Sequence, residues 1–241
     1  MATLLTPYGR NPGRIVGGVT LGQPGPLADG SPAMAFDGAT GYIATPPMNF
    51  TGGLTLEAWV WVDSTNPNTH PNKGILVQRV GGSANEILAS YNGNGWDIGY
   101  QVAPNNATDY AWTSTILPTQ TWTHAVVTQD PVQGTVVYAN VVVQATQPTW
   151  TGNLALGSAP FWIGYDFWNA PYRYFPGKIA QAAVYDYALQ PAQIQAHYNA
   201  RTLTQPGAYA AVVLADRPAA YWPLTDASGP WAHDAVLRPA A

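Results

Sequence analysis

The chain of 241 residues contains no cysteine. Thiol nucleophiles, cysteine-ligated zinc, iron–sulfur clusters and a disulfide scaffold are therefore excluded. A folded chain near this length buries roughly 70–75 % of its unfolded surface, so a hydrophobic core can form without crosslinks. We expect one large domain, or one domain plus a fragment.

Charged residues are also scarce, at 9 % of the chain against a usual share of about 25 %. The net charge of −4 provides no basic surface for a phosphate backbone, so we expect no nucleic-acid partner. Disorder is disfavoured, because ten Trp and 14 Tyr residues supply large apolar faces.

Long hydrophobic runs are missing as well. No window approaches the roughly 18 apolar residues of a membrane span. Residues 1–14 lack the apolar stretch of a secretory signal peptide. We therefore expect no membrane insertion and no signal peptide in this chain. An extracellular or virion-surface location would then need another route, such as release of a virion by lysis or trimming from a longer secreted chain.

Short strand-like runs separated by Gly, Pro and Asn clusters predict an all-β fold, a two-sheet antiparallel jelly-roll sandwich. The clearest run is 54–62, where aliphatic residues alternate with a face that carries Trp59 and Trp61. Further strands are predicted at 74–80, 86–91, 96–102, 111–116, 122–129, 135–143, 161–165, 177–185 and 219–224. Helices are predicted at 189–200, where Pro191 suits a first turn, and at 207–215.

Several segments, in this order, resemble the laminin-G-like, concanavalin A-like lectin/glucanase jelly-roll family, including its bacterial and phage members. The matching segments lie at 35–38 with 41–43 (AFDG and GYI), 54–60 (LTLEAWV), 73–79 (KGILVQR), 122–129 (WTHAVVTQ), 161–166 (FWIGYD) and 175–189 (FPGKIAQAAVYDYAL). The resemblance covers residues 34–201. It implies two packed antiparallel sheets with a short helix near the end.

The two ends of the chain are in an unusual order. In bacterial and phage relatives, a unit opens with a segment that resembles 209–234 and continues with one that resembles 16–38. Here the opening segment comes last, so we divide the chain into a laminin-G-like domain at 1–205 and a terminal helix–strand segment at 206–241. Tyr221, Trp222 and Leu224 need partners, which either their own domain or a neighbouring subunit could supply. Donation between subunits would favour self-assembly.

Catalytic patterns are absent. The chain has only two glutamates, Glu57 and Glu86, and lacks both the E-x-D-x-x-E pattern of glucanases with this fold and a G-x-S-x-G motif. The four histidines have no partner at relay or metal spacing and are interpreted as structural, with His124 packed in its strand. We therefore predict that the chain is not an enzyme.

Calcium is the common cofactor of the family that the chain resembles, and Asp37 matches the Asp of the family's F-D-G element. Ala180 and Gln181 stand where the family often has an acidic pair, which removes oxygen ligands. We expect no cofactor, with calcium at Asp37 as a weaker alternative. Otherwise Asp37 caps a local turn.

Two aromatic and polar segments are the best candidates for ligand binding, because sugars stack on aromatic rings while amides and carboxylates hold their hydroxyl groups. The alternative is that most of these rings pack in the core. The candidate glycan contacts are Trp96, Asp97, Tyr110, Trp112, Asp166, Trp168, Asn169, Tyr172 and Arg173.

Two functions follow from these observations. The first is a non-enzymatic module with a structural or attachment role on a virion or cell surface, of the phage decoration or tail type, whose partners are its own subunits or other surface proteins. The alternative is a carbohydrate-binding lectin module of a secreted protein, with glycans as partners. The missing catalytic acids and the displaced terminal segment favour the first.

Overall fold

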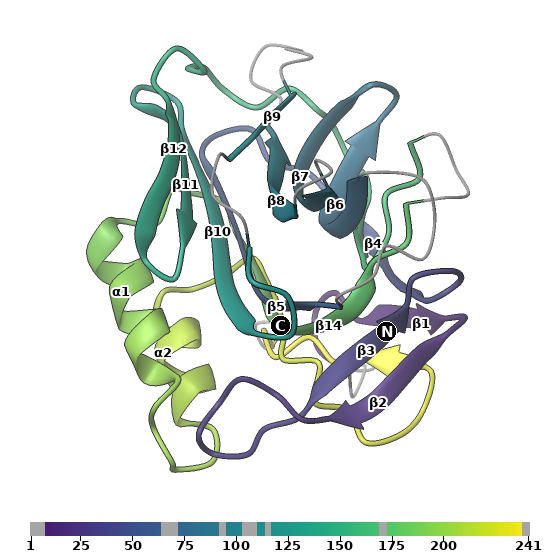
Figure 1. Ribbon diagram of the computed structural model, residues 1–241. Helices are drawn as coiled ribbons and strands as arrows, with labels where there is room; N and C mark the ends of the chain where they lie inside the picture. The colour runs from purple at the N-terminus through teal and green to yellow at the C-terminus, as the bar shows by residue number, and fades with distance from the viewer. Residues whose placement is uncertain are drawn as a thin grey trace, which may run out of the picture.

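The computed structural model describes residues 8–63, 72–91, 95–102, 110–113, 117–168 and 173–237. Two antiparallel sheets pack face to face, which confirms the predicted all-β sandwich (Figure 1). Sheet A contains, in spatial order, β16 (Trp231–Ala232), β1 (Gly13–Val16), β4 (Tyr42–Met48), β13 (Ala159–Ile163), β6 (Asn72–Val80), β7 (Ser83–Tyr91), β8 (Trp96–Gln101) and β9 (Tyr110–Trp112).

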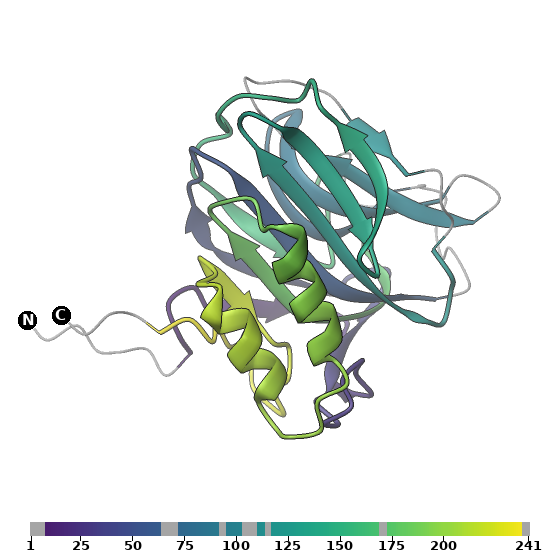
Figure 2. The same cartoon turned by 90° about the vertical axis from the view of Figure 1, so that its left-hand side faces the viewer.

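Sheet B forms the second layer and carries the two helices on its outer face (Figure 2). The helices are α1 (Pro191–Ala200) and α2 (Ala208–Ala215), and no helix in the described part of the chain is long and apolar enough to cross a membrane. The strands of sheet B, in spatial order, are β12 (Val142–Gln147), β11 (Gly134–Ala139), β10 (Trp122–Asp130), β5 (Leu54–Val62), β14 (Pro176–Tyr185), β3 (Ala33–Asp37) and β2 (Val19–Gln23). In addition, β15 (Ala220–Trp222) pairs with β14.

The alternation along β5 divides its residues between two cores. Leu56 and Val60 belong to the main core between the sheets, whereas Trp59 belongs to a second core between sheet B and the helices. In that second core Trp59 donates its indole N–H to the hydroxyl of Tyr209 at 2.9 Å. Both faces of β5 are therefore covered, and its glutamate, Glu57, is buried with Trp59 beneath the helices.

One strand prediction was wrong. The run 135–143 is two strands, β11 and β12, joined by a turn in which Ala139 pairs with Val142. Asn140 and Val141 both have positive φ, 48° and 67°, as a two-residue turn between twisted strands requires. The apolar alternation continues through this turn without a glycine, which conceals it in the sequence.

The terminal segment packs within its own chain. In β15, Tyr221 and Trp222 pair with β14, and both side chains are buried, as is Leu224. The Trp222 indole N–H donates to the carbonyl of Asn11 at 2.8 Å, and β16 pairs with β1. Residues from both ends of the described chain thus complete the two sheets of one sandwich.

Candidate functional site

An open pocket of about 410 Å³ lies on the face of sheet A that is turned away from the core. In β7 and β8, Ile87 and Ile98 point into the core, and the residues that alternate with them point outward. Glu86 stands opposite Gln101 in this pairing. The pocket is lined by Asn72, Arg79, Gly82, Glu86, Gln101, Trp168 and Arg173.

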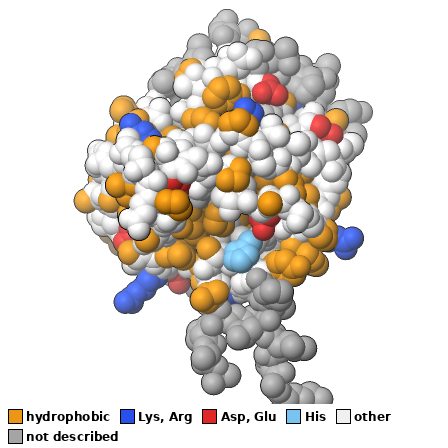
Figure 3. Space-filling view, turned by 90° about the horizontal axis from the view of Figure 1, so that it is seen from below, with side chains coloured by type: hydrophobic (Ala, Val, Ile, Leu, Met, Phe, Trp, Pro, Cys, Tyr) orange, Lys and Arg blue, Asp and Glu red, His pale blue; other side chains and the backbone are white. Residues whose placement is uncertain are grey.

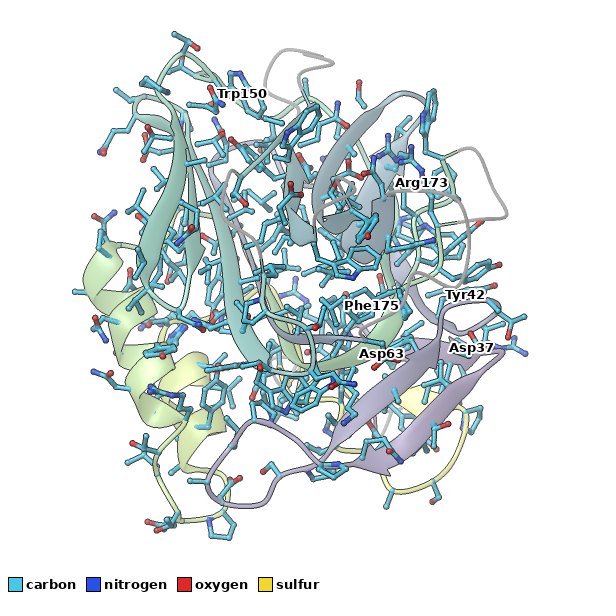
Figure 4. All side chains as sticks on the ribbon, viewed as in Figure 1. Asp37, Tyr42, Asp63, Trp150, Arg173 and Phe175 are labelled. Carbon is cyan, nitrogen blue, oxygen red and sulfur yellow. The ribbon has the colours of Figure 1, made fainter. Side chains whose placement is uncertain are left out.

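Asp166, which follows β13, organises the charges of this pocket. Its Oδ1 accepts hydrogen bonds from Nε of Arg79 at 2.9 Å and from the backbone N–H of Trp168 at 3.0 Å. Its Oδ2 accepts one from Nη1 of Arg173 at 2.5 Å. A buried carboxylate between two guanidinium groups fixes both arginines in one geometry, because charge-assisted hydrogen bonds are short and directional. Figure 4 shows Arg173 next to β6.

Glu86 is the second buried carboxylate, and only one of its oxygens is satisfied. Oε2 accepts a hydrogen bond from Nη2 of Arg79 at 2.5 Å. Oε1 is buried and has no hydrogen-bond partner among the described residues. Burial raises the pKa of Glu86 to about 7, an effect that Arg79 opposes and the charge of Asp166 increases. A buried polar atom without a partner in a pocket is an acceptor for a ligand.

Trp168 forms the aromatic wall of the pocket. Its side chain is 39 % exposed, and the guanidinium carbon of Arg79 lies 5.5 Å from the centre of its ring. A Cβ atom added to Gly82 would lie 3.6 Å from the ring edge, so the glycine keeps open the space beside the indole. The pocket thus combines a flat apolar wall with a polar floor, an arrangement suited to a hydroxylated ring.

An aromatic cluster borders the pocket on the same face of sheet A, over β4 and β13. Tyr42 and Trp162 have ring centres 5.3 Å apart, and Tyr165 stacks on Tyr174 at 4.2 Å. Because β13 pairs with β6, this cluster lies next to the strand that carries Arg79. The outer face of sheet A therefore changes from aromatic to charged across neighbouring strands.

The structure places three of the predicted contacts, Asp166, Trp168 and Arg173, together at the pocket. Asp97 is buried on β8 opposite Ser90 and does not line the pocket. Trp112 is 59 % exposed on β9, at the edge of sheet A, and also lies outside the pocket lining. Asn169, Tyr172 and the side chain of Tyr110 lie outside the described residues.

Trp96 was wrongly predicted as a ligand contact. Its side chain is 1 % exposed and belongs to the main core, because it alternates with Asp97 and shares a face of β8 with Ile98. Sequence reasoning also missed Arg79, Glu86 and Gln101. The available signal was that polar residues alternate with the core-facing Ile87 and Ile98 on β7 and β8, and so share the face that points away from the core.

A second buried ionisable cluster lies on the outer face of sheet B, beneath α1. Glu57 accepts hydrogen bonds from Nε2 of His124 at 2.6 Å and from Nδ1 of His197 at 3.0 Å. His197 reaches Asp216 with its other nitrogen at 3.0 Å, and the hydroxyl of Tyr185 donates to Glu57 at 3.2 Å. Packing of His124 in its strand agrees with its structural interpretation, but the partners of both histidines were not foreseen.

The charges of this cluster stabilise one another. Burial alone would raise the pKa of Glu57, but the two histidines lower it to well below its usual range. Burial would lower the pKa of His197, but Glu57 and Asp216 raise it. Both ring nitrogens of His197 face carboxylates, as in a protonated imidazole. Glu57, His124 and His197 are at most 1 % exposed, so the centre of the cluster is closed, and only Asp216 at its edge is partly exposed.

Asp37 caps the turn that follows β3. Its Oδ1 accepts the backbone N–H groups of Ala39, Thr40 and Gly41 at 2.8–2.9 Å, and its Oδ2 accepts the Thr40 hydroxyl at 2.7 Å. Burial would raise the pKa of Asp37, but these hydrogen bonds lower it to about 2. The hydrogen bonds of Asp37 fit the predicted turn cap, and the described residues contain no group of three or more His, Asp or Glu that could hold a metal ion.

Several solved structures share this fold. A proposed carbohydrate-binding protein from Bacteroides ovatus aligns with a TM-score of 0.58 and 18 % identity, covering 93 % of this chain and 55 % of the other. The receptor binding domain of a botulinum neurotoxin C/D mosaic serotype aligns with a TM-score of 0.59 and 15 % identity, covering 80 % of this chain and 47 % of the other. A Trypanosoma rangeli sialidase aligns with a TM-score of 0.52 and 19 % identity, covering 69 % of this chain and 27 % of the other. The chain thus spans about half the length of the first two.

No protein of curated function matches the chain in sequence. A family model described as the concanavalin A-like lectin/glucanases superfamily matches residues 37–195, which is more than half of the chain. This match and the two-sheet fold confirm the resemblance drawn from the sequence segments. The chain belongs to the concanavalin A-like lectin/glucanases superfamily.

Proposed function

We propose that this chain is a carbohydrate-binding module that holds a sugar in the pocket on the outer face of sheet A. One observation carries the proposal. The exposed ring of Trp168 stands in the same pocket as the unsatisfied Oε1 of buried Glu86. The apolar C–H face of a sugar would stack on the indole, and one of its hydroxyl groups would donate to Glu86.

The pocket is organised before a ligand arrives. Asp166 already holds Arg79 and Arg173, so these side chains lose little further freedom when a sugar binds. Gln101 and Asn72 add amide groups to the floor of the pocket, where they would contact further hydroxyl groups. A site whose charged groups are fixed by their own partners favours specificity through geometry.

Binding without hydrolysis is the better supported activity. Glycoside hydrolysis requires two carboxyl groups that flank the scissile bond. Among the described residues, Glu86 is the only acid that lines the pocket. The nearby Asp166 has both carboxylate oxygens engaged by arginines and a backbone N–H group, so it is not free to act as the second acid. We further propose that binding needs no cofactor, so chelation with EDTA would leave the affinity unchanged.

Glycans outside the cell or on a cell surface are the proposed partners. The structural role on a virion that the sequence favoured is less well supported than this alternative. The similar Bacteroides ovatus structure is that of a proposed carbohydrate-binding protein. The terminal segment that suggested assembly pairs with β14 of its own chain.

A glycan array followed by titration calorimetry tests the proposal. Trp168→Ala and Glu86→Gln are each expected to weaken binding by about tenfold, since each removes a contact worth roughly 1–2 kcal/mol. Trp112→Ala is the matched control, because it removes an exposed tryptophan of sheet A outside the pocket lining. Silence across a broad array, or loss of binding in Trp112→Ala alone, would refute the assignment. Release of reducing ends from a bound glycan would refute the non-enzymatic role.

A further inference from the structure

A second pocket, of about 470 Å³, lies where residues 10–11 meet residues 217–219, away from the residues of the proposed sugar site. Segments before β1, at the end of β4, after β14 and between α2 and β15 converge on it. It is lined by Arg10, Asn11, Pro47, Met48, Asn49, Phe50, Asp186, Arg217, Pro218 and Ala219. Residues more than 200 positions apart in the sequence thus form one concave surface.

Two arginines distinguish this pocket in a chain that has few charges. Figure 3 illustrates how sparse Lys and Arg side chains are on one face of the molecule. Arg79 and Arg173 are ion-paired, and Arg201 stacks on Tyr198 at 3.6 Å. Arg10 and Arg217, in contrast, are exposed and form no ion pair among the described residues. Their positive charges are available to a ligand.

The backbone around the pocket is held firmly. The backbone N–H of Asn11 donates to Asp234 at 2.8 Å, and its side-chain amide donates to the carbonyl of Ala219 at 3.3 Å. Arg217 follows Asp216, the C-cap of α2, and has a φ of 52°, the left-handed conformation with which many helices end. Its backbone N–H donates to the carbonyl of Leu214, and two residues later the backbone N–H of Ala219 donates to the carbonyl of Val184. The end of α2 therefore fixes the backbone from which the Arg217 side chain projects.

We propose that this second pocket binds an anionic sugar-type ligand, with the oxyanion between Arg10 and Arg217 and a neighbouring hydroxyl group on Asp186. Guanidinium groups bind phosphate, sulfate and carboxylate through paired N–H donors. Asp186 also lines the pocket, and a carboxylate accepts hydrogen bonds from hydroxyl groups. This site is independent of the sugar pocket on sheet A, with which it shares no lining residue.

Titration calorimetry of the full chain with glucose 6-phosphate, glucose 6-sulfate, glucuronate, glucose and inorganic phosphate tests the site and distinguishes the oxyanions. At least one anionic sugar is expected to bind, more weakly as salt increases, whereas glucose does not bind at this site. Arg10→Gln and Arg217→Gln should each weaken that binding by about tenfold. Arg217→Gly should have the same effect on binding without loss of stability, because glycine readily adopts the left-handed conformation at this helix end.

Two control variants keep the outcome clear. Arg14→Gln removes an exposed arginine of β1 that does not line the pocket, and it should leave the affinity unchanged. Trp168→Ala should also leave it unchanged. The proposal is overturned if no anionic sugar binds, if the arginine variants bind as well as the parent chain, or if Trp168→Ala abolishes binding. Equal affinity for inorganic phosphate and glucose 6-phosphate would overturn the role of Asp186.

Discussion

Both sheets carry buried ionisable groups on their outer faces, but only one of these faces is closed. On sheet B, α1 and α2 cover Glu57, and both of its oxygens accept hydrogen bonds from histidines or tyrosine. On sheet A, the Glu86 pocket is open, and one carboxylate oxygen has no partner among the described residues. We therefore expect the same residue type to serve stability where it is sealed and satisfied, and to serve ligand binding where it lines an open pocket with one oxygen unsatisfied.

The largest expected effect comes from breaking the sealed cluster. Glu57→Ala leaves His124 and His197 buried without the central carboxylate, and removal of one partner of a buried ion pair costs about 3–5 kcal/mol of the free energy of unfolding. Glu86→Ala, the matched change on the open face, should cost only about 1 kcal/mol, because Arg79 keeps its ion pair with Asp166 and water can enter the pocket. Urea denaturation of both variants measures the difference, and equal destabilisation would remove the distinction between the two faces.

The pH dependence of stability sharpens the same comparison. The folded-state pKa of His197 is raised, so the stability from its pairing is fully present below its unfolded value of 6.5 and is lost as the pH rises through the raised pKa. The pKa of Glu57 is lowered, so its contribution is present above the unfolded value of 4.5 and is lost towards lower pH. The contribution of this cluster to the free energy of unfolding should therefore be greatest between pH 4.5 and pH 6.5, the unfolded pKa values of Glu57 and His197.

The variant His197→Asn tests this dependence. The difference in the free energy of unfolding between the parent chain and the variant should be about 2 kcal/mol or more near pH 6, and it should shrink as the pH rises. Urea titrations at several pH values between 5 and 9 measure it. His233→Asn, which changes a histidine outside the cluster, is the control. A difference that stays constant across this range would show that His197 contributes only packing.

On the open face, titration should affect binding more than stability. Burial raises the pKa of Glu86 to about 7, so its carboxyl group is largely protonated at pH 6 and largely ionised at pH 8. A sugar hydroxyl donates more strongly to the ionised form, so affinity should increase severalfold over this interval, about 1 kcal/mol. Calorimetry at both pH values checks this, with Glu86→Gln expected to show a flat profile. An equal rise in that variant would assign the effect to another group.

Strands could be predicted from the sequence where the residue types on their two faces differ, and a helix could be predicted where a proline marks its first turn. The alternation along 54–62 and the Pro191 start of α1 both indicated the observed structure. The alternation along β8 did not tell which of its faces meets the core, so Trp96 was placed in a binding site. The turn at Asn140 was missed because the apolar pattern runs through it.

The sites were harder to predict because they form between distant residues. Trp168 and Arg173, which line the pocket, were named as candidates because aromatic and polar residues lie together in one short segment. Glu57 and its histidine partners are 67 and 140 positions apart, so no local spacing links them. Arg79 and Asp166 are 87 positions apart and meet because β6 pairs with β13. Such pairs depend on strand order, which a single sequence does not specify.

The smallest effect on stability is expected at Gly82, on the rim of the open pocket. Its φ is not in the left-handed region, and a Cβ atom there would make only ordinary contact with Trp168, at 3.6 Å. Gly82→Ala should therefore change the free energy of unfolding by less than about 0.5 kcal/mol. Gly82→Leu would place a branched side chain against the indole and fill the space beside it. We expect it to abolish sugar binding while urea denaturation stays close to that of Gly82→Ala. Full affinity in Gly82→Leu would show that the sugar does not enter beside Trp168.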